Sequence, residues 1–205
     1  MKKAMAIGLI LALTLALTGC GKSNPEAAID KFFSAVKAYD SEAMSEALAP
    51  SETDNLGSAS EYLKESTDPV AAPFMDYLKG NATKITYEVT ESKIDGDMAT
   101  VTVKCKYVDG SQIFAKLIQE LFAKLVTAEF SVKELTKEEI TQLSVDLLNQ
   151  NLATATETFI EKTFDISCVN VDGTWYVKTV SDEMADVVSS NLFTSTKELA
   201  GTFGE

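Results

Sequence analysis

Apolar residues follow a helical spacing at the start of the folded chain. They come after Asn24, Pro25 and Glu26, which supply an N-cap, a proline at the first helical position and an acid in the first turn. Apolar residues three and four positions apart share one face of a helix. The pattern therefore predicts an amphipathic helix that buries Ile29, Phe32, Phe33, Val36 and Tyr39.

The following stretch predicts shorter helical pieces. A second helix is expected to begin near Asp40 or Ser41, to bury Met44 and Leu48, and to stop before Pro50, because proline cannot continue a helix. Residues 51–60 are polar and turn-like. A weaker helical pattern follows over residues 62–78 and is closed by Lys79-Gly80-Asn81.

Near residue 85 the pattern changes to alternation, which is typical of a half-buried strand. Two alternating runs flank Asp95-Gly96-Asp97. A two-residue Asp-Gly loop would set Val89 opposite Thr102 and mix the core face with the polar face. A three-residue loop pairs Ile94 with Met98 and sets Val89 opposite Val103 and Tyr87 opposite Cys105. We therefore expect the three-residue loop, with Gly96 or Asp97 at positive φ.

About fifty residues of helical pattern separate this hairpin from a second one. A wide apolar stripe over residues 113–126 predicts one helix, and the capping box at 136–139 starts another that continues at helical spacing to Phe159. Phe164, Ile166 and Cys168 then alternate into a hairpin at Asp172-Gly173, which returns through Trp175, Tyr176 and Val177. Residues 182–199 predict one final amphipathic helix.

These elements predict an α+β fold with an antiparallel sheet, packed with helices, and an enlarged helical pair between the two hairpins. No stretch of the chain reads as a linker long enough to separate two domains, so residues 25–205 are expected to form a single domain.

The N-terminus predicts export and lipid attachment. Met1-Lys2-Lys3 is a short positive region, and the apolar stretch after it is too short to span a bilayer as a helix. It ends in Leu17-Thr18-Gly19-Cys20, a lipobox. Residues 1–19 are therefore expected to be a lipoprotein signal peptide, Cys20 to carry diacylglycerol, and residues 20–24 to form a short tether. The protein would then be anchored in the cell envelope, on the outer face of the cell membrane if the cell is Gram-positive.

Composition excludes several kinds of chemistry. The 205 residues include 18 basic residues, all of them lysine, against 31 acidic ones and no histidine. Missing histidine and arginine remove the usual triad base and the bidentate phosphate clamp. A net charge of −13 argues against nucleic-acid binding. Asp95-Gly96-Asp97 is too short for a calcium loop, so no metal or cofactor is expected.

The chain resembles the nuclear transport factor two-like (cystatin-like) group of small bacterial lipoproteins. The resemblance lies in residues 25–40 with 44–48, in residues 94–103, and in residues 171–177. It implies a curved, cone-like sheet whose mouth is closed by the first helix. The resemblance gives a fold and a location, and it supplies no catalytic motif.

The lipobox, the missing catalytic residue types and the resemblance together lead to two functional hypotheses. The leading hypothesis is a membrane-anchored, non-enzymatic protein that binds a small molecule or an envelope protein in or at the cone. The alternative is an isomerase-like or hydratase-like enzyme with an acid in an apolar cavity, for which Asp40 and Glu88 are the candidate acids. The residues proposed to line the cavity are Tyr39, Tyr87, Tyr107 and Trp175. Each also has a structural interpretation: a cap for Asp40, a solvent-facing strand position for Glu88, and core packing for the aromatic residues.

Cys105 and Cys168 both lie on the apolar faces of their predicted strands. An exported protein permits a disulfide between them, whereas two buried thiols would pack as small hydrophobic groups. The sequence leaves both alternatives open. Neither thiol is expected to be a nucleophile, because the chain has no histidine to activate it.

Overall fold

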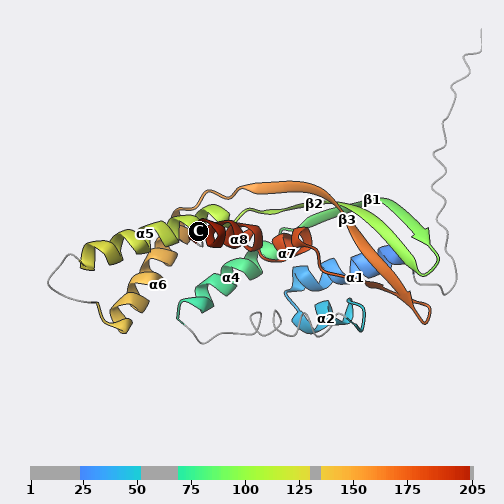
Figure 1. Cartoon of the computed structure of the whole chain (residues 1–205), viewed down its shortest axis with the longest axis horizontal. Helices are drawn as coiled ribbons and strands as arrows, with labels where there is room; N and C mark the ends of the chain where they lie inside the picture. Colours follow the sequence, from blue (N-terminus) through green and yellow to red (C-terminus); the bar gives the residue numbers. More distant parts are fainter. Residues whose placement is uncertain (1–23, 52–68, 130–134, 204–205) are drawn as a thin grey trace, which may run out of the picture.

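The structure is a computed structural model, and it describes residues 24–51, 69–129 and 135–203. Helices lie on one face of a sheet and extend beyond one of its ends (Figure 1). The elements follow the order α1 (Pro25–Ala38), α2 (Ser41–Glu46), α4 (Ala71–Ala82), β1 (Thr86–Asp95), β2 (Met98–Val108), α5 (Ser111–Glu129), α6 (Lys137–Thr154), β3 (Phe159–Val171), β4 (Thr174–Val177), α7 (Asp182–Val188) and α8 (Leu192–Phe203).

The first two helices begin where their caps predict. The Asn24 side chain accepts a hydrogen bond from the Ala27 amide at 2.8 Å, with Pro25 at the first helical position. The Asp40 carboxylate accepts one from the Ala43 amide at 3.0 Å. Between the helices, Tyr39 turns the chain in the left-handed conformation, with φ 55°. Each cap satisfies an amide that the first turn of its helix leaves without a partner.

The sheet confirms the antiparallel α+β prediction. Its four strands lie in the order β1-β2-β3-β4, each antiparallel to its neighbours. The expected cone-like curvature is wrong, because the sheet is not strongly curled (Figure 1). Helix α1 contacts all four strands from one side, and the opposite side carries the exposed residues of the alternating pattern.

The first hairpin has the expected pairing of its apolar residues, but its turn differs from the predicted loop. Asp95 pairs with Met98 across a two-residue turn, and Gly96 in that turn has φ +59°. Thr90 is then skipped in the pairing, as a β-bulge, so that Val89 lies opposite Val103 and Tyr87 opposite Cys105. The three-residue loop is therefore wrong, whereas positive φ at Gly96 and the pairing beyond the bulge are confirmed. A bulge adds one residue to one strand, so every residue beyond it on that strand points to the opposite face of the sheet from the one it would have without the bulge.

The helical pair between the hairpins is present. Helices α5 and α6 pack against each other, and Thr136 with Glu139 forms the expected capping box. The predicted helical continuation to Phe159 is wrong, because α6 ends at Thr154 and Phe159 opens strand β3. Phe159 is exposed there, and the Lys106 ammonium lies 4.7 Å from its ring centre.

The C-terminal region contains two helices where one was predicted. Helix α7 stops after Val188, and α8 starts at Leu192. Ser190 and Asn191 between them have φ 55° and 68°, a left-handed conformation that an α-helix does not contain. The second hairpin agrees with the prediction: Val171 pairs with Thr174 across Asp172-Gly173, and both turn residues have positive φ.

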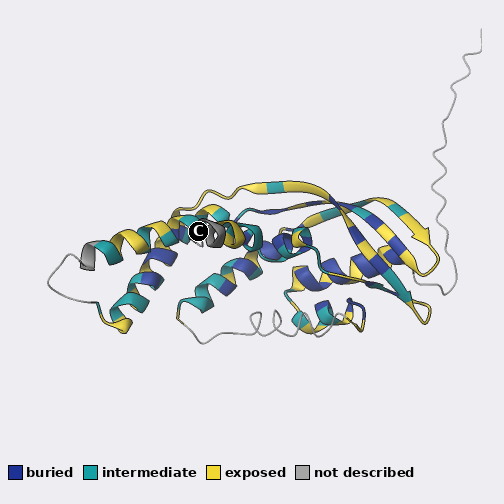
Figure 2. Ribbon diagram, viewed as in Figure 1, coloured by how far each residue is buried: buried dark blue, intermediate teal, exposed yellow. Residues whose placement is uncertain are grey.

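The main core lies between α1 and the sheet, where buried side chains from both layers meet (Figure 2). Phe32 and Phe33 are almost completely buried and contact each other edge to face at 5.6 Å. Burying one such side chain contributes about 2–3 kcal/mol. The predicted buried face of the first helix is confirmed at Ile29, Phe32, Phe33 and Val36, whereas Tyr39 is only partly buried.

Candidate functional site

An open groove of about 420 Å³ lies where α1, α2 and β4 meet. Its floor is apolar and contains Leu48 and Trp175, and its rim carries the charged side chains of Lys31 and Glu46. The remaining lining residues are Ser45, Pro50, Thr174 and Tyr176. An apolar floor with a few polar groups at the rim is the composition expected of a binding site.

The groove is held in shape by contacts across its walls. The Lys31 ammonium lies 3.3 Å from the Glu46 carboxylate and donates a hydrogen bond to the Glu46 carbonyl at 3.1 Å, which joins α1 to α2. The segment after α2 runs beside β4: the Val177 amide donates to the Ala47 carbonyl at 3.0 Å, and the Ala49 amide donates to the Val177 carbonyl at 2.8 Å. These backbone bonds fix Leu48 against the strand that carries Trp175.

The groove presents charged, hydroxyl and apolar groups. Its lining residues include one ammonium, one carboxylate and the hydroxyl groups of Ser45, Thr174 and Tyr176. None of them is a histidine or a cysteine, the side chains that most often activate or supply a nucleophile. The rim charges can pair with a polar ligand of either sign, while Trp175 and Leu48 offer apolar contact.

The structure brings only one of the four proposed cavity residues to this groove, and that residue is Trp175. The space under the sheet that a cone would enclose is filled by core side chains, among them Tyr107, which is 1% exposed. The Tyr39 hydroxyl points toward the Met75 sulfur at 3.9 Å. Tyr87 stacks on Phe33 and donates a hydrogen bond to Asp30 at 2.8 Å.

The environments of these tyrosines raise their pKa values. Burial raises the pKa of Tyr39 to about 12. Burial and then the hydrogen bond to Asp30 raise the pKa of Tyr87 to about 12. For Tyr107, burial is the main cause of a raised pKa, and the charges of Asp186 and Asp109 add to it. All three phenols therefore stay protonated at neutral pH.

The two candidate acids of the enzyme hypothesis have structural positions. Asp40 caps α2 through the Ala43 amide. Glu88 is exposed on β1 and pairs across the sheet with Lys104. Neither carboxylate lies among the residues that line the groove.

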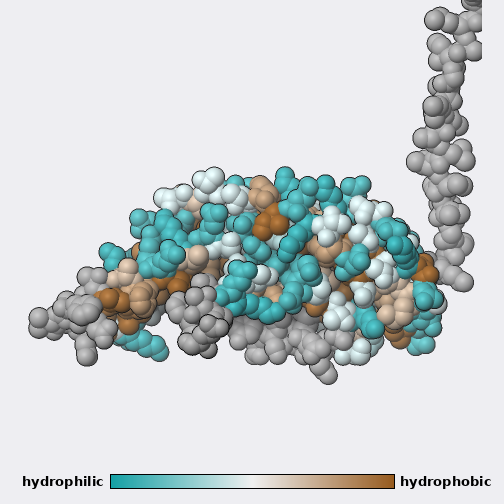
Figure 3. Space-filling model, turned by 45° about the horizontal axis from the view of Figure 1, so that its top comes forward, coloured by the Kyte–Doolittle hydropathy of each residue, from teal (hydrophilic) through white to brown (hydrophobic). Residues whose placement is uncertain are grey.

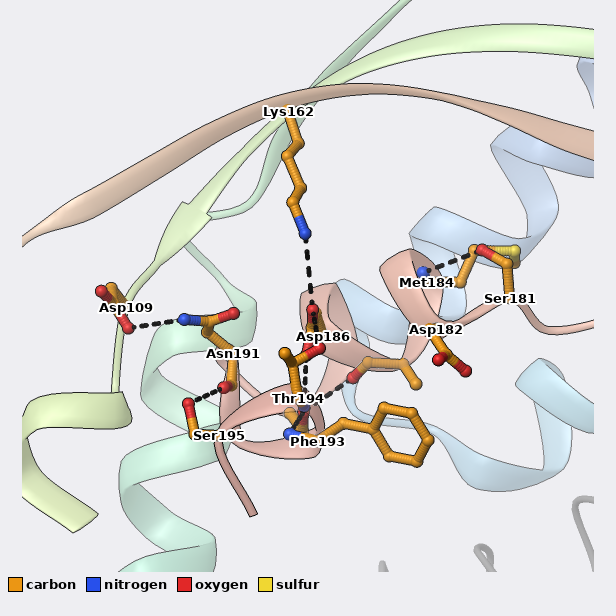
Figure 4. A network of polar contacts seen from close by, with 12 residues as sticks. Asp109, Lys162, Ser181, Asp182, Met184, Asp186, Asn191, Phe193, Thr194 and Ser195 are labelled. Carbon is orange, nitrogen blue, oxygen red and sulfur yellow. Dashed lines mark hydrogen bonds and ion pairs between the residues drawn. The ribbon is translucent and has the colours of Figure 1, made fainter. Parts of the chain in front are cut away.

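A buried acid that the sequence analysis missed lies in α7, near the turn to α8. Asp186 is 1% exposed, and Figure 4 shows it at the centre of a polar network. It accepts hydrogen bonds from the Thr194 amide at 2.9 Å and from the Thr194 hydroxyl at 2.7 Å. The Lys162 ammonium reaches in from β3 to 3.6 Å. A buried carboxylate needs such partners, because its desolvation is costly.

This network fixes the corner of the C-terminal helices. The Asn191 amide donates to the Asp186 carbonyl at 2.7 Å, and the Asn191 side chain donates to Asp109 at 3.1 Å. The signal in the sequence was the small polar run Ser189-Ser190-Asn191, which favours a helix break over a continuous helix. With a break at that point, Asp186 caps the next helix instead of facing solvent.

Cys105 and Cys168 are free thiols, both fully buried. They lie on neighbouring strands, but Cys105 pairs with Lys162 and Cys168 pairs with Ala99. The offset of six residues from position 162 to position 168 corresponds to about 20 Å of strand. A disulfide needs Cα atoms within about 7 Å, so the arrangement favours the two packed thiols over the disulfide. Burial raises the pKa of each thiol to about 12.

Cys20, the signal peptide over residues 1–19 and most of the tether at 20–24 lie outside the described residues, as do the polar turns predicted over 52–60. In the part of the chain that is described, no helix is long and apolar enough to cross a membrane. The described residues also contain no cluster of three or more acids and thiols suited to a metal ion.

Comparisons with known proteins give one family and one distant structure. The model of a family described as a domain of unknown function (DUF4878) matches residues 18–122, about half of the chain. Among curated proteins no match is found. A crystal structure of YcdA from Bacillus subtilis, provisionally assigned as a lipoprotein, is similar at 18% identity with a TM-score of 0.38. The match covers 82% of this chain and 47% of that chain, a level of similarity that carries no argument about function.

Proposed function

The chain belongs to the DUF4878 family, a domain of unknown function, and from this premise we propose that it is a lipid-anchored envelope protein that binds a partner without catalysis. The observation that carries the proposal is the lipobox Leu17-Thr18-Gly19-Cys20, placed five residues before the first helical residue, Pro25. Two acyl chains on Cys20 would meet the requirement for stable membrane attachment.

The nuclear transport factor two-like resemblance is part of this proposal. It is supported by the helix α1, which lies across one face of an antiparallel sheet, and by the two Asp-Gly turns at the sheet end. The filled core under the sheet favours binding at the surface over capture of a ligand inside a cone.

The binding surface is proposed to be the groove at Trp175. Its openness fits an extended segment of another envelope protein better than an enclosed small molecule, and its floor and rim supply both apolar and charged contacts. The isomerase or hydratase alternative gains no support from the acids assigned to it, because Asp40 caps a helix and Glu88 is exposed.

The anchor is tested by labelling cells with an alkyne-bearing fatty acid. The wild-type protein should take up the label, and Cys20→Ala should not. Cys168→Ala is the matched control, since its thiol is buried and it should leave labelling unchanged. Equal labelling of wild type and Cys20→Ala would overturn the anchor.

The groove is tested by placing a photo-crosslinking residue at Tyr176, which lines the groove, or at Lys104, which is exposed on β2 and does not line the groove. A specific adduct should form in cells from position 176 only, and Glu46→Lys should remove it by reversing a rim charge. Adducts of the same mass from both positions, or none from position 176, would contradict a protein partner at the groove.

A further inference from the structure

Exposed apolar side chains concentrate at one end of the sheet. Five large apolar residues are exposed in the part of the chain that the structure describes, and three of them flank the two hairpin turns. Ile94 is 60% exposed, Met98 38% and Val171 37%. Exposed apolar side chains are common singly, whereas their concentration at one place is a feature of membrane and protein contacts.

The two turns lie together at one end of the sheet, which we name the hairpin end and define by Ile94, Met98, Val169 and Val171. Ile94 lies on the face of the sheet that packs against α1, and the other three residues lie on the opposite face. Met98 pairs directly with Val169 across β2 and β3. The Asn170 amide donates a hydrogen bond to the Asp97 carbonyl at 2.8 Å, which ties the second hairpin to the turn of the first.

The N-terminus of the domain emerges beside the hairpin end. Ile94 pairs with Ala99, and Ala99 pairs with Cys168. The Cys168 sulfur lies 4.0 Å from the carbonyl oxygen of Pro25, the first residue of α1. Figure 1 shows the start of α1 close to both turns, and Figure 3 shows hydrophobic atoms at this end of the molecule.

The anchor would hold this end close to lipid. Cys20 precedes Asn24 by four residues, which span at most about 14 Å when fully extended. Whatever path the tether takes, Asn24 must stay within about that distance of the backbone of the acylated residue, so α1 starts near it. The helical pair α5–α6 lies at the opposite end of the molecule and would point away from the membrane (Figure 1).

We propose that the hairpin end is the membrane-facing surface of the anchored protein, with Ile94, Met98 and Val171 in contact with the interface of the lipid leaflet. This inference rests on the proposed lipid anchor. The occupant is a bilayer surface, because the tether brings no other surface so near.

The charges at the hairpin end limit how deeply its side chains can enter the lipid leaflet. Asp97 and Asp172 lie in the two turns, and Asp95 ends β1 directly before the first turn. Ionised carboxylates are costly to place among acyl chains, so they would remain at the level of the headgroups. The apolar side chains would therefore reach the headgroup region and no further, which adds a weak contact to the strong one made by the acyl chains.

The test uses the mature lipidated protein in phosphatidylcholine vesicles, with a fluorescent label on one introduced cysteine. The variants are Ile94→Cys and Met98→Cys, with Phe122→Cys on α5 as the matched control, since Phe122 is 67% exposed at the far end. Cys105 and Cys168 are fully buried and Cys20 is acylated, so only the introduced thiol should react.

Vesicles with nitroxide-bearing phosphatidylcholine should quench about half or more of the emission at positions 94 and 98 and leave position 122 almost unchanged. Equal quenching at all three positions, or none at 94 and 98, would overturn the proposal. Flotation of the protein with the vesicles reports the anchor separately: protein that floats without quenching refutes the hairpin end alone, whereas protein that fails to float refutes the anchor.

Discussion

Asp186 accepts hydrogen bonds from both the amide and the hydroxyl of Thr194, eight residues later along the chain. The carboxylate thereby caps α8 from the preceding helix, across a turn in which two residues are left-handed. Because Asp186 is 1% exposed, water cannot replace these bonds if the carboxylate is removed.

Asp186→Ala should lower the free energy of unfolding by about 2–3 kcal/mol, since it leaves the Thr194 donors and the Lys162 charge without their partner. Asp186→Asn keeps one acceptor for the Thr194 amide and should cost less. The control is Asp182→Ala, whose carboxylate is exposed and pairs with Lys197, with an expected cost below about 1 kcal/mol. Urea unfolding followed by circular dichroism compares the three; equal costs for Asp186→Ala and Asp182→Ala would refute this role.

Tyr107→Phe should be nearly neutral or stabilising. The Tyr107 hydroxyl is buried and has no hydrogen-bond partner among the described residues. Removing such a group relieves its desolvation, so the expected change is within about 1 kcal/mol or favourable. Tyr87→Phe is the comparison, because it loses the bond to Asp30 and should be mildly destabilising. A clearly larger loss for Tyr107→Phe than for Tyr87→Phe in urea unfolding would show that the hydroxyl has a partner.

The same substitution should have opposite effects at two glycines. Gly96→Ala should destabilise the protein by about 1 kcal/mol, because Gly96 has φ +59°, where a Cβ is strained. Gly80→Ala should stabilise it by about 0.5–1 kcal/mol, because Gly80 lies within α4 and a Cβ there meets no atom within 4 Å. Thermal unfolding of both variants measures the signs, and a shift in the same direction for both would contradict the turn geometry.

The two buried cysteines should be protected thiols. With burial raising the pKa of both to about 12, neither thiolate forms at pH 8, and the strand register keeps the two sulfurs apart. Alkylation of the folded protein at pH 8 should therefore modify neither residue, and alkylation in urea should modify both. Intact mass without reductant provides the check: a loss of two hydrogens would establish the disulfide instead.

Stability should fall at alkaline pH. The folded pKa of Cys105 and Cys168 is raised from 9.0 to about 12, and that of Tyr39 and Tyr87 from 10.0 to about 12. The unfolded chain ionises these groups first, so unfolding releases protons above pH 9. Stability is fully present below about pH 9 and is lost as the pH rises toward 12. Urea midpoints at pH 8, 10 and 11 should decrease in that order, and less steeply when both cysteines are replaced by alanine. A flat profile would refute burial of these groups.

Local chemistry in the sequence was sufficient for much of the fold. Asn24 and Asp40 cap the helices they were expected to cap, and the Asp172-Gly173 turn sets the second hairpin. These signals depend on hydrogen bonds over three or four residues, which the sequence shows directly.

The errors came from features decided by contacts across the fold. The prediction placed one extra residue in the hairpin loop, whereas the structure places it at Thr90 as a bulge. Either position keeps the apolar residues of β1 and β2 on the same face, so the alternating pattern alone cannot distinguish them. The break between α7 and α8 goes with the burial of Asp186. Its ion-pair partner, Lys162, lies on β3 and is distant in the sequence. The helical spacing of apolar residues does not predict such a distant partner.

The candidate site was the hardest part to predict. Trp175 was chosen for its position after a turn, and it does line the groove. Tyr39, Tyr87 and Tyr107 were chosen for a cone, which the sheet does not form because it is not strongly curled. Lys31 and Glu46 meet only because α1 and α2 fold back on each other, a contact between residues fifteen positions apart that neither helix pattern reveals.

The bulge at Thr90 also affects how copies of the chain can associate along the edge of the sheet. Strand β1 lies at the edge of the sheet, with backbone groups that a like strand from another molecule can pair with. An irregular edge, flanked by the charges of Glu88, Glu91 and Lys93, disfavours such pairing and so keeps copies of the chain from joining edge to edge into a continuous ribbon.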